Sequence, residues 1–196
     1  MKNKGFTLIE LLIVVSLIII VVGVTGDIVI SLVRSYNKTQ ITNEVEQNGN
    51  FAITKLEKEL RNSSQVVSPP PSSDLNTRRS DSIEFVRSLS GGGSETITYA
   101  FVEADDLFGD AEADVYVLTR AVDSGSPVAL TNYSSPSGVT TIDGLNMSAF
   151  ENISDTSGSG PTVIKILLSV RQVGNPAVQF TQTTTLESTV VLRGSY

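Results

Sequence analysis

The first 33 residues of the chain are dominated by one long apolar run. No charged residue occurs between Leu11 and Gly26. A helix from Phe6 to Gly26 would be roughly 32 Å long at about 1.5 Å per residue, which matches the hydrocarbon thickness of a bilayer, roughly 30 Å. This stretch can therefore span a membrane as a single helix.

Glu10 is the exception inside this apolar environment. An ionised carboxylate at such a depth costs a few kcal/mol and is found where it has a partner or a function. The sequence therefore marks Glu10 as a residue that needs an explanation.

The run KGFTLIE from Lys4 to Glu10, with the apolar residues after it, resembles the class III signal of type IV pilins and type II secretion pseudopilins. The resemblance implies that a prepilin peptidase cleaves between Gly5 and Phe6, that the new amino group of Phe6 is methylated, and that Glu10 stays in the mature chain. It also implies that the Glu10 carboxylate pairs with the N-terminal amine of a neighbouring subunit during assembly. Such a pairing would account for the buried charge, because an opposite charge would meet it.

Two other interpretations of the N-terminus are an ordinary secretory signal peptide and a plain signal anchor. In a signal peptide, Lys2 and Lys4 would form the charged region and Leu11 to Val24 the apolar region. Against this, the apolar run continues through Ile28 to Val33, and no clear small-x-small cleavage site follows it.

The composition excludes most catalytic chemistry. The chain has no Cys and no His, which removes disulfides, zinc thiolate sites, thiol nucleophiles and the commonest general base. We therefore predict that the protein is not an enzyme and needs no cofactor. The net charge of −7 makes nucleic acid an unlikely partner, and Arg78, Arg79 and Arg87 are the only cluster of positive charge in the middle of the chain.

An amphipathic pattern continues the apolar run, so one helix is predicted from Phe6 to about Arg61. Its end is expected near Asn62 to Gln65, ahead of three consecutive prolines. Asp27, next to Gly26 and near Gly23, either marks the membrane boundary or replaces the helix-bending proline of many pilins. The predicted buried stripe comprises Ile41, Val45, Asn48, Ala52, Leu56 and Leu60, widened by Phe51 and Ile53.

The rest of the chain reads as strands separated by turns. Polarity alternates along Ser82 to Leu89 and along Glu95 to Val102, on either side of Gly91-Gly92-Gly93, and this pattern predicts an antiparallel hairpin. The stretch from Ser68 to Arg79 instead reads as a surface connection. The further predicted strands are Val115 to Val122, Val128 to Thr131, Val139 to Ile142, Thr162 to Val173 and Val178 to Arg193.

The segment from Glu103 to Asp114 is the most acidic part of the chain. A Ca²⁺ loop is chemically possible there, although the spacing does not match the EF-hand pattern, and a solvated turn between strands is the alternative. The candidate oxygen ligands are Asp105, Asp106, Asp110, Glu112 and Asp114.

Together these patterns predict an α+β fold in which a long N-terminal helix packs on an antiparallel β-sheet, as in pilins. We expect four parts: a leader at 1–5, a transmembrane or filament-core helix at 6–33, the amphipathic second half of the helix at 34–66, and a globular β domain at 67–196. The stretches Asn48 to Arg61 and Phe180 to Arg193 resemble W-type minor pilins and J-type minor pseudopilins.

The resemblance implies a structural subunit, most consistent with a minor one, of a type IV pilus or a type II secretion pseudopilus. It would enter the inner membrane as a single-pass prepilin with its domain outside and then join a filament. The implied partners are other pilin subunits, the prepilin peptidase, the inner-membrane assembly platform and membrane lipid. The alternative is a filament-tip binding module, either an adhesin or a DNA-uptake pilin.

Overall fold

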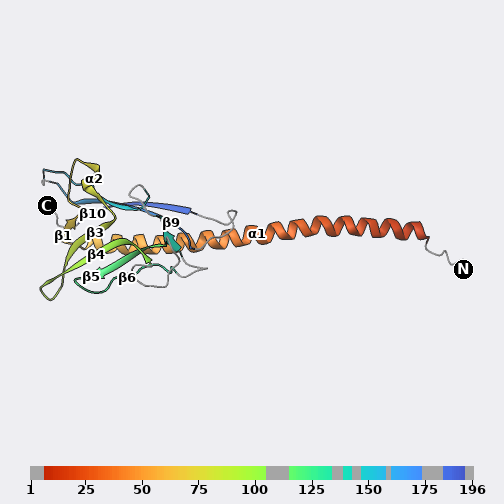
Figure 1. Cartoon of the computed structure of the whole chain (residues 1–196), viewed down its shortest axis with the longest axis horizontal. Coiled ribbons are helices and arrows are strands. Elements are labelled where there is room, and N and C mark those ends of the chain that lie inside the picture. The colour runs from red at the N-terminus through yellow and green to blue at the C-terminus, as the bar shows by residue number, and fades with distance from the viewer. Residues whose placement is uncertain are drawn as a thin grey trace. The chain divides into compact units, whose positions relative to one another are not determined.

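The computed structural model of the chain describes residues 7–104, 115–133, 139–142, 147–157, 160–173 and 183–192. The chain divides into two compact units, Met1–Gln40 and Ile41–Tyr196. Helix α1 (Leu8–Arg61) begins in the first unit and ends in the second (Figure 1). Its last residue agrees with the predicted helix end, within the usual uncertainty of one or two residues.

The second unit contains the buried face of α1. Val45, Ala52, Leu56 and Leu60 are buried there, as the stripe of three- and four-residue spacings predicts, and so is Ile53. The prediction that Phe51 widens the stripe is wrong, because its side chain is 56% exposed. At 3.6 residues per turn, Phe51 lies on the flank of the helix and not on its buried face.

The described strands of the second unit form one sheet in which every pair of neighbours is antiparallel. The main path through the sheet runs β1-β3-β4-β5-β7-β9-β8-β2, with β10 on β9 and β6 on β5. The strands are β1 (Gln65–Ser68), β2 (Arg79–Ser80), β3 (Ser82–Ser88), β4 (Ser94–Glu103), β5 (Tyr116–Val122), β6 (Val128–Ala129), β7 (Val139–Thr141), β8 (Ala149–Asn152), β9 (Val163–Gln172) and β10 (Thr183–Val191).

The hairpin predicted around the three glycines is confirmed. β3 pairs along its whole length with the first part of β4, from Ser82 opposite Ala100 to Ser88 opposite Ser94. Gly92 and Gly93 have φ values of 78° and 113°. Residues with a Cβ atom rarely adopt φ values in this range, which explains why glycines occupy the turn.

The interpretation of Ser68 to Arg79 as a plain surface connection is wrong in part. This stretch contains the short helix α2 (Leu75–Arg78), whose N-cap Asp74 accepts a hydrogen bond from the Asn76 amide at 3.2 Å. β1 and β2, also absent from the prediction, lie at its two ends. Strands of two to four residues are too short to show a clear alternation of polarity, so sequence periodicity could not reveal them.

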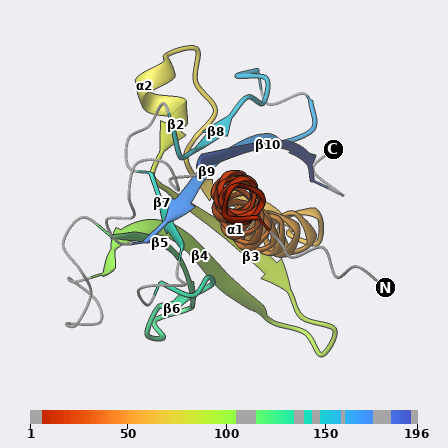
Figure 2. The ribbon, with the colours of Figure 1, turned by 90° about the vertical axis from the view of Figure 1, so that its right-hand side faces the viewer.

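The core lies between the second half of α1 and the sheet. Figure 2 shows this part of α1 with β3 and β4 on one side and β9 and β10 on the other. Phe85 stacks on Tyr99 with ring centroids 6.0 Å apart, and Phe101 on Phe150 at 5.0 Å. The fold is thus α+β, with a long N-terminal helix and a large antiparallel sheet, as predicted.

Candidate functional site

The N-terminal end of α1 is the candidate functional site, and Glu10 lies in its first turn. The Glu10 carboxylate accepts hydrogen bonds from the backbone N–H and the hydroxyl of Thr7, both at 3.1 Å. In return, the Glu10 backbone N–H donates to the Thr7 hydroxyl at 3.3 Å. This reciprocal arrangement is a capping box, which satisfies N–H groups that the first turn of a helix leaves without partners.

The capping box gives Glu10 a role within its own chain. A carboxylate in the first turn also interacts favourably with the positive end of the helix dipole. Sequence reasoning missed Thr7, although the Thr-x-x-Glu pattern of residues 7 to 10 is the known signature of this cap. The cleavage site between Gly5 and Phe6 lies outside the described residues, so the pairing of Glu10 with a Phe6 amine stays a prediction.

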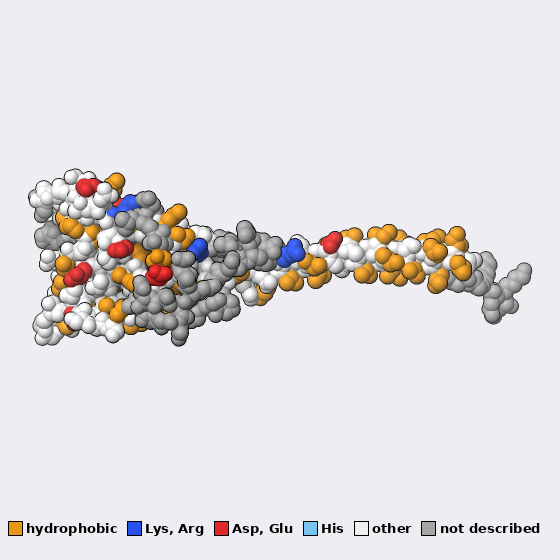
Figure 3. All heavy atoms as spheres, in the orientation of Figure 1, with side chains coloured by type: hydrophobic (Ala, Val, Ile, Leu, Met, Phe, Trp, Pro, Cys, Tyr) orange, Lys and Arg blue, Asp and Glu red, His pale blue; other side chains and the backbone are white. Residues whose placement is uncertain are grey.

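The surface of α1 that follows Glu10 is apolar, and no described part of the chain covers it. The exposed fraction of the large apolar side chains from Leu8 to Val33 ranges from 45% to 81%. Figure 3 shows hydrophobic side chains on this part of the helix. A continuous exposed apolar surface of this kind requires lipid or protein to cover it, and the helix is long and apolar enough to cross a membrane.

Two hydroxyl groups within this apolar part are satisfied internally. The Ser16 hydroxyl donates to the Leu12 carbonyl at 2.8 Å, and the Thr25 hydroxyl donates to the Val21 carbonyl at 2.7 Å. Both bonds reach back four residues along the helix, so neither hydroxyl needs water. This arrangement suits a helix surrounded by lipid or by other apolar helices.

The helix continues through Gly26 and Asp27 without interruption. A Cβ atom added at Gly23 or at Gly26 would meet no atom within 4 Å, so packing within the chain does not require glycine at either position. The structure thus has no break at this point, and the interpretation of Asp27 as a membrane boundary stays a prediction.

The proposed calcium ligands, Asp105 to Asp114, lie outside the described residues. Among the residues that the structure does describe, no group of three or more acidic side chains is arranged to hold a metal ion. The calcium loop therefore stays a prediction that rests on sequence alone.

The arginines of the middle of the chain pair with carboxylates. Arg78 and Arg79 both contact the buried Glu151 carboxylate at 2.8 Å, and Arg87 pairs with Glu95. Burial opposes ionisation of Glu151, but the hydrogen bond and charge of Arg79, together with Arg78, lower its pKa below the ordinary value. These arginines are therefore largely neutralised within the domain and do not form an open phosphate-binding patch.

A second polar cluster ties the end of α1 to the sheet. Glu59 accepts hydrogen bonds from the Tyr99 hydroxyl at 2.9 Å and from Arg120 Nε at 2.9 and 3.2 Å. Burial, followed by the charge and hydrogen bond of Glu59, raises the pKa of Tyr99. Burial alone would lower the pKa of Arg120, but the contact with Glu59 outweighs it and raises that pKa.

Comparison with known families identifies the N-terminal segment. Residues 1–26 match the prokaryotic N-terminal methylation motif. The N-terminus of the chain thus carries a prepilin-type signal, of the kind found in pilins and pseudopilins. The motif implies processing by a prepilin peptidase and assembly with other pilin subunits, and together with the apolar helix it supports membrane anchoring.

Comparison with curated proteins and with solved structures found no match for this chain. The matched motif ends at residue 26 and the first strand of the sheet begins at Gln65, so the match covers no part of the sheet.

Proposed function

We propose that this protein is a minor subunit of a type IV pilus or a type II secretion pseudopilus. The observation that carries the proposal is the prepilin motif on a helix whose large apolar side chains from Leu8 to Val33 are exposed. Before processing, the chain spans the inner membrane once, with Lys2 and Lys4 on the cytoplasmic side in accord with the positive-inside rule. Residues 41–196 then lie outside the cytoplasm.

In this proposal, the apolar part of α1 passes from one apolar environment to another. Prepilin peptidase cleaves after Gly5, and Phe6 becomes the methylated N-terminus. The inner-membrane assembly platform then moves the helix from lipid into a filament core of neighbouring pilin helices. The pairing of Glu10 with the Phe6 amine of a neighbour sets the axial register, because only one offset brings the opposite charges together.

The assignment as a minor subunit is supported by sequence features alone. The stretches Asn48 to Arg61 and Phe180 to Arg193 resemble W-type minor pilins and J-type minor pseudopilins, and the chain lacks the cysteine pair of many major pilins. The α+β arrangement, in which the second half of α1 packs on an antiparallel sheet, supports the pilin-like assignment.

No specific observation favours the tip-binding alternative. A DNA-uptake pilin would be expected to present free cations to phosphate, whereas Arg78, Arg79 and Arg87 each pair with a glutamate.

The assembly role of Glu10 can be tested by substitution in the native host. We expect Glu10→Ala to insert into the membrane normally and to lower incorporation into sheared filaments at least tenfold, because the register-setting charge is lost. Glu46→Ala, at an exposed glutamate farther along α1, is the matched control and should assemble normally. Normal incorporation of Glu10→Ala would contradict the mechanism.

Processing can be tested by mass spectrometry of the mature chain. We expect an N-terminus at methylated Phe6, and we expect Gly5→Leu to retain its leader. A mature N-terminus at Met1 or near Asp27 would overturn the proposed function.

A further inference from the structure

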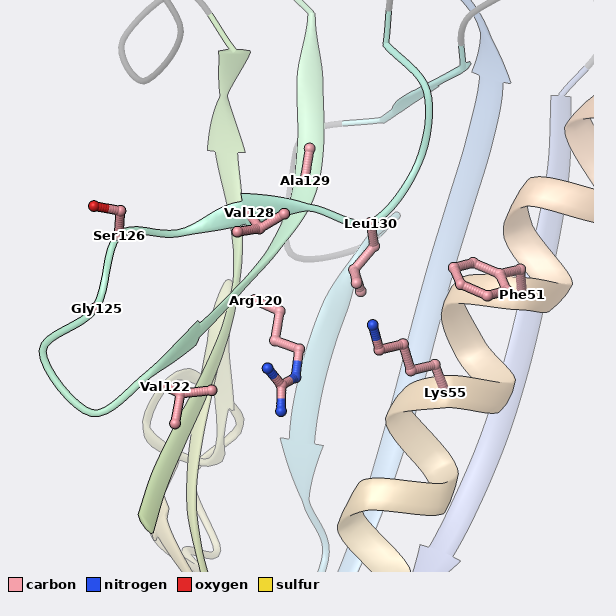
Figure 4. Close-up of a pocket in the computed structure, with 9 residues that line it drawn as sticks. All are labelled: Phe51, Lys55, Arg120, Val122, Gly125, Ser126, Val128, Ala129 and Leu130. Carbon is pink, nitrogen blue, oxygen red and sulfur yellow. The ribbon is translucent and has the colours of Figure 1, made fainter.

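A groove of about 440 Å³ lies beside the second half of α1, within the unit Ile41–Tyr196. Phe51 and Lys55 of α1 line one wall. The other wall contains Val122 of β5, Val128 of β6 and Leu130, the residue after β6 (Figure 4). The volume is in the range of pockets that hold small ligands or peptide side chains.

The charge of the groove is positive in a chain that is acidic overall. Lys55 and Arg120 line it, and none of its described lining residues is acidic. Arg120 is paired with Glu59, whereas Lys55 forms no ion pair with any described carboxylate and has its Nζ 5.9 Å from the centre of the Phe51 ring. Figure 4 shows Lys55 extending from α1 toward Arg120 and Leu130. The groove therefore presents one cation whose charge the described residues leave uncompensated.

The rim of the groove exposes large apolar side chains. Phe51 is 56% exposed and Val128 is 64% exposed. Covering these side chains would remove apolar surface from water, which favours binding of an apolar group. A ligand that suits both features carries carboxylates next to large apolar side chains.

We propose that this groove binds the acidic segment Glu103 to Asp114 of a second copy of the chain. Leu107 and Phe108 in that segment match the apolar walls, and the carboxylates around them match Lys55. Residues 105–114 lie outside the described residues, so only their sequence enters the proposal. The inference goes beyond the proposed function, because two copies can make this contact without cleavage after Gly5 or filament assembly.

Isotope-resolved cross-linking tests whether the contact joins two copies. Unlabelled and ¹⁵N-labelled full-length protein are mixed in detergent and treated with a carbodiimide, which condenses a lysine amine with a nearby carboxylate. We expect cross-linked peptides that join Lys55 to residues 103–114 and contain one labelled and one unlabelled partner. Absence of Lys55 cross-links, or cross-links confined to one copy, would overturn the proposal.

Binding of a synthetic peptide tests the chemistry of the groove. A fluorescent peptide with the sequence of residues 103–115 is titrated against the full chain, and we expect Lys55→Glu to weaken binding at least tenfold. Lys55→Gln should give an intermediate loss, and circular dichroism checks that both variants are folded. Lys58→Glu is the matched control, because Lys58 is exposed on the same helix outside the groove. Equal binding by Lys55→Glu and the unaltered chain, or no binding by the unaltered chain, would overturn the proposal.

The two proposals fail in distinguishable ways. Cross-linking and peptide binding use purified protein and do not depend on cleavage after Gly5. Normal processing and filament incorporation without the Lys55 contact would therefore overturn only the groove proposal. A mature N-terminus at Met1 or near Asp27 would instead overturn the proposed function.

Discussion

At the scale of single residues, Glu10 has two possible partners. Within its own chain it completes a capping box with Thr7, and in the proposed filament it pairs with a neighbouring amine. The cap leaves the carboxylate at the exposed start of α1, where it remains accessible to a second chain. Thr7 thus positions the residue on which the proposed assembly depends.

Loss of the Thr7 hydroxyl should loosen the first turn of α1. We expect Thr7→Ala to destabilise this turn by about 1 kcal/mol, the usual cost of losing an N-cap side chain. Hydrogen exchange of the full chain in detergent would show faster exchange at the Ile9 to Leu11 amides. Thr7→Ser keeps the hydroxyl and should retain the protection, and equal exchange in all three chains would contradict a structural role for the cap.

Glu151 should make the stability of the second unit depend on pH. Its pKa is lowered in the folded chain, so its stabilising contribution is complete above the ordinary glutamate pKa. That contribution is lost as the pH falls from about 5 through the lowered folded-state value. We expect Glu151→Gln to reduce the free energy of unfolding at pH 7 by about 2–3 kcal/mol, because Arg78 and Arg79 lose their charged partner.

Urea denaturation at pH 7 and pH 3 would measure this effect. The difference between Glu151→Gln and the unaltered chain should be smaller at pH 3, because Glu151 of the unfolded chain is then largely protonated and the stabilising contribution of the charge has decreased. A difference that is the same at both pH values would contradict the role of the charge. Glu84→Gln, at a half-buried glutamate that is not among the groups acting on Glu151, is the matched control.

At the scale of elements, the second half of α1 is held to the sheet by apolar contacts and by polar ties. Glu59 bonds to Tyr99 of β4 and Arg120 of β5, and Glu57 accepts a hydrogen bond from Ser188 of β10. The partner residues lie on β4, β5 and β10, which are distant from α1 in sequence. These hydrogen bonds therefore fix the helix relative to all three strands.

Gly49 of α1 belongs to the same interface. A Cβ atom there would lie 2.7 Å from Leu186 Cδ1 and 3.0 Å from Val170 Cγ2. Both distances are shorter than ordinary van der Waals contact, so the glycine allows α1 to approach β9 and β10 closely. The loss of helix propensity, about 1 kcal/mol relative to alanine, is therefore offset by packing.

Substitution of Gly49 should reveal this close approach. We expect Gly49→Leu to lower the free energy of unfolding by about 1–3 kcal/mol through overpacking, measured by urea denaturation. Gly49→Ala should be near neutral, because its gain in helix propensity opposes a clash that the flexible end of Leu186 can relieve. Gly23→Ala should leave this transition unchanged, and a stabilised Gly49→Leu would contradict the packing role.

At the scale of the whole molecule, the two units differ in what covers their apolar side chains. All the residues of α1 up to Gln40 are exposed, whereas the buried side chains of the described chain begin at Val45. The second unit therefore buries its own core, and the first unit depends on lipid or on other subunits for cover.

This difference predicts how a shortened chain behaves. We expect a fragment that starts at Thr39 to be soluble without detergent and to keep its β-sheet content, because its core residues are all retained. The full chain should require detergent or membranes. Size-exclusion chromatography and circular dichroism would measure both properties, and an aggregated or unfolded fragment would contradict a self-sufficient core.

The sequence by itself determined the features that depend on local pattern. The apolar run predicted the membrane-compatible part of α1. Alternation predicted the hairpin of Ser82 to Leu89 and Glu95 to Val102, in which Ile83, Phe85, Ile97 and Tyr99 are buried. Periodicity could do this because burial repeats every two residues in a strand and about every 3.6 in a helix.

Only the tertiary structure decided which distant residues meet. Arg79 pairs with Glu151, 72 residues away, and Arg120 with Glu59, 61 residues away. The same long-range arrangement leaves Lys55 beside an open groove and brings Gly49 against β9 and β10. Such contacts depend on strand order and register, which follow from the packing of the whole sheet and not from the residues next to each position.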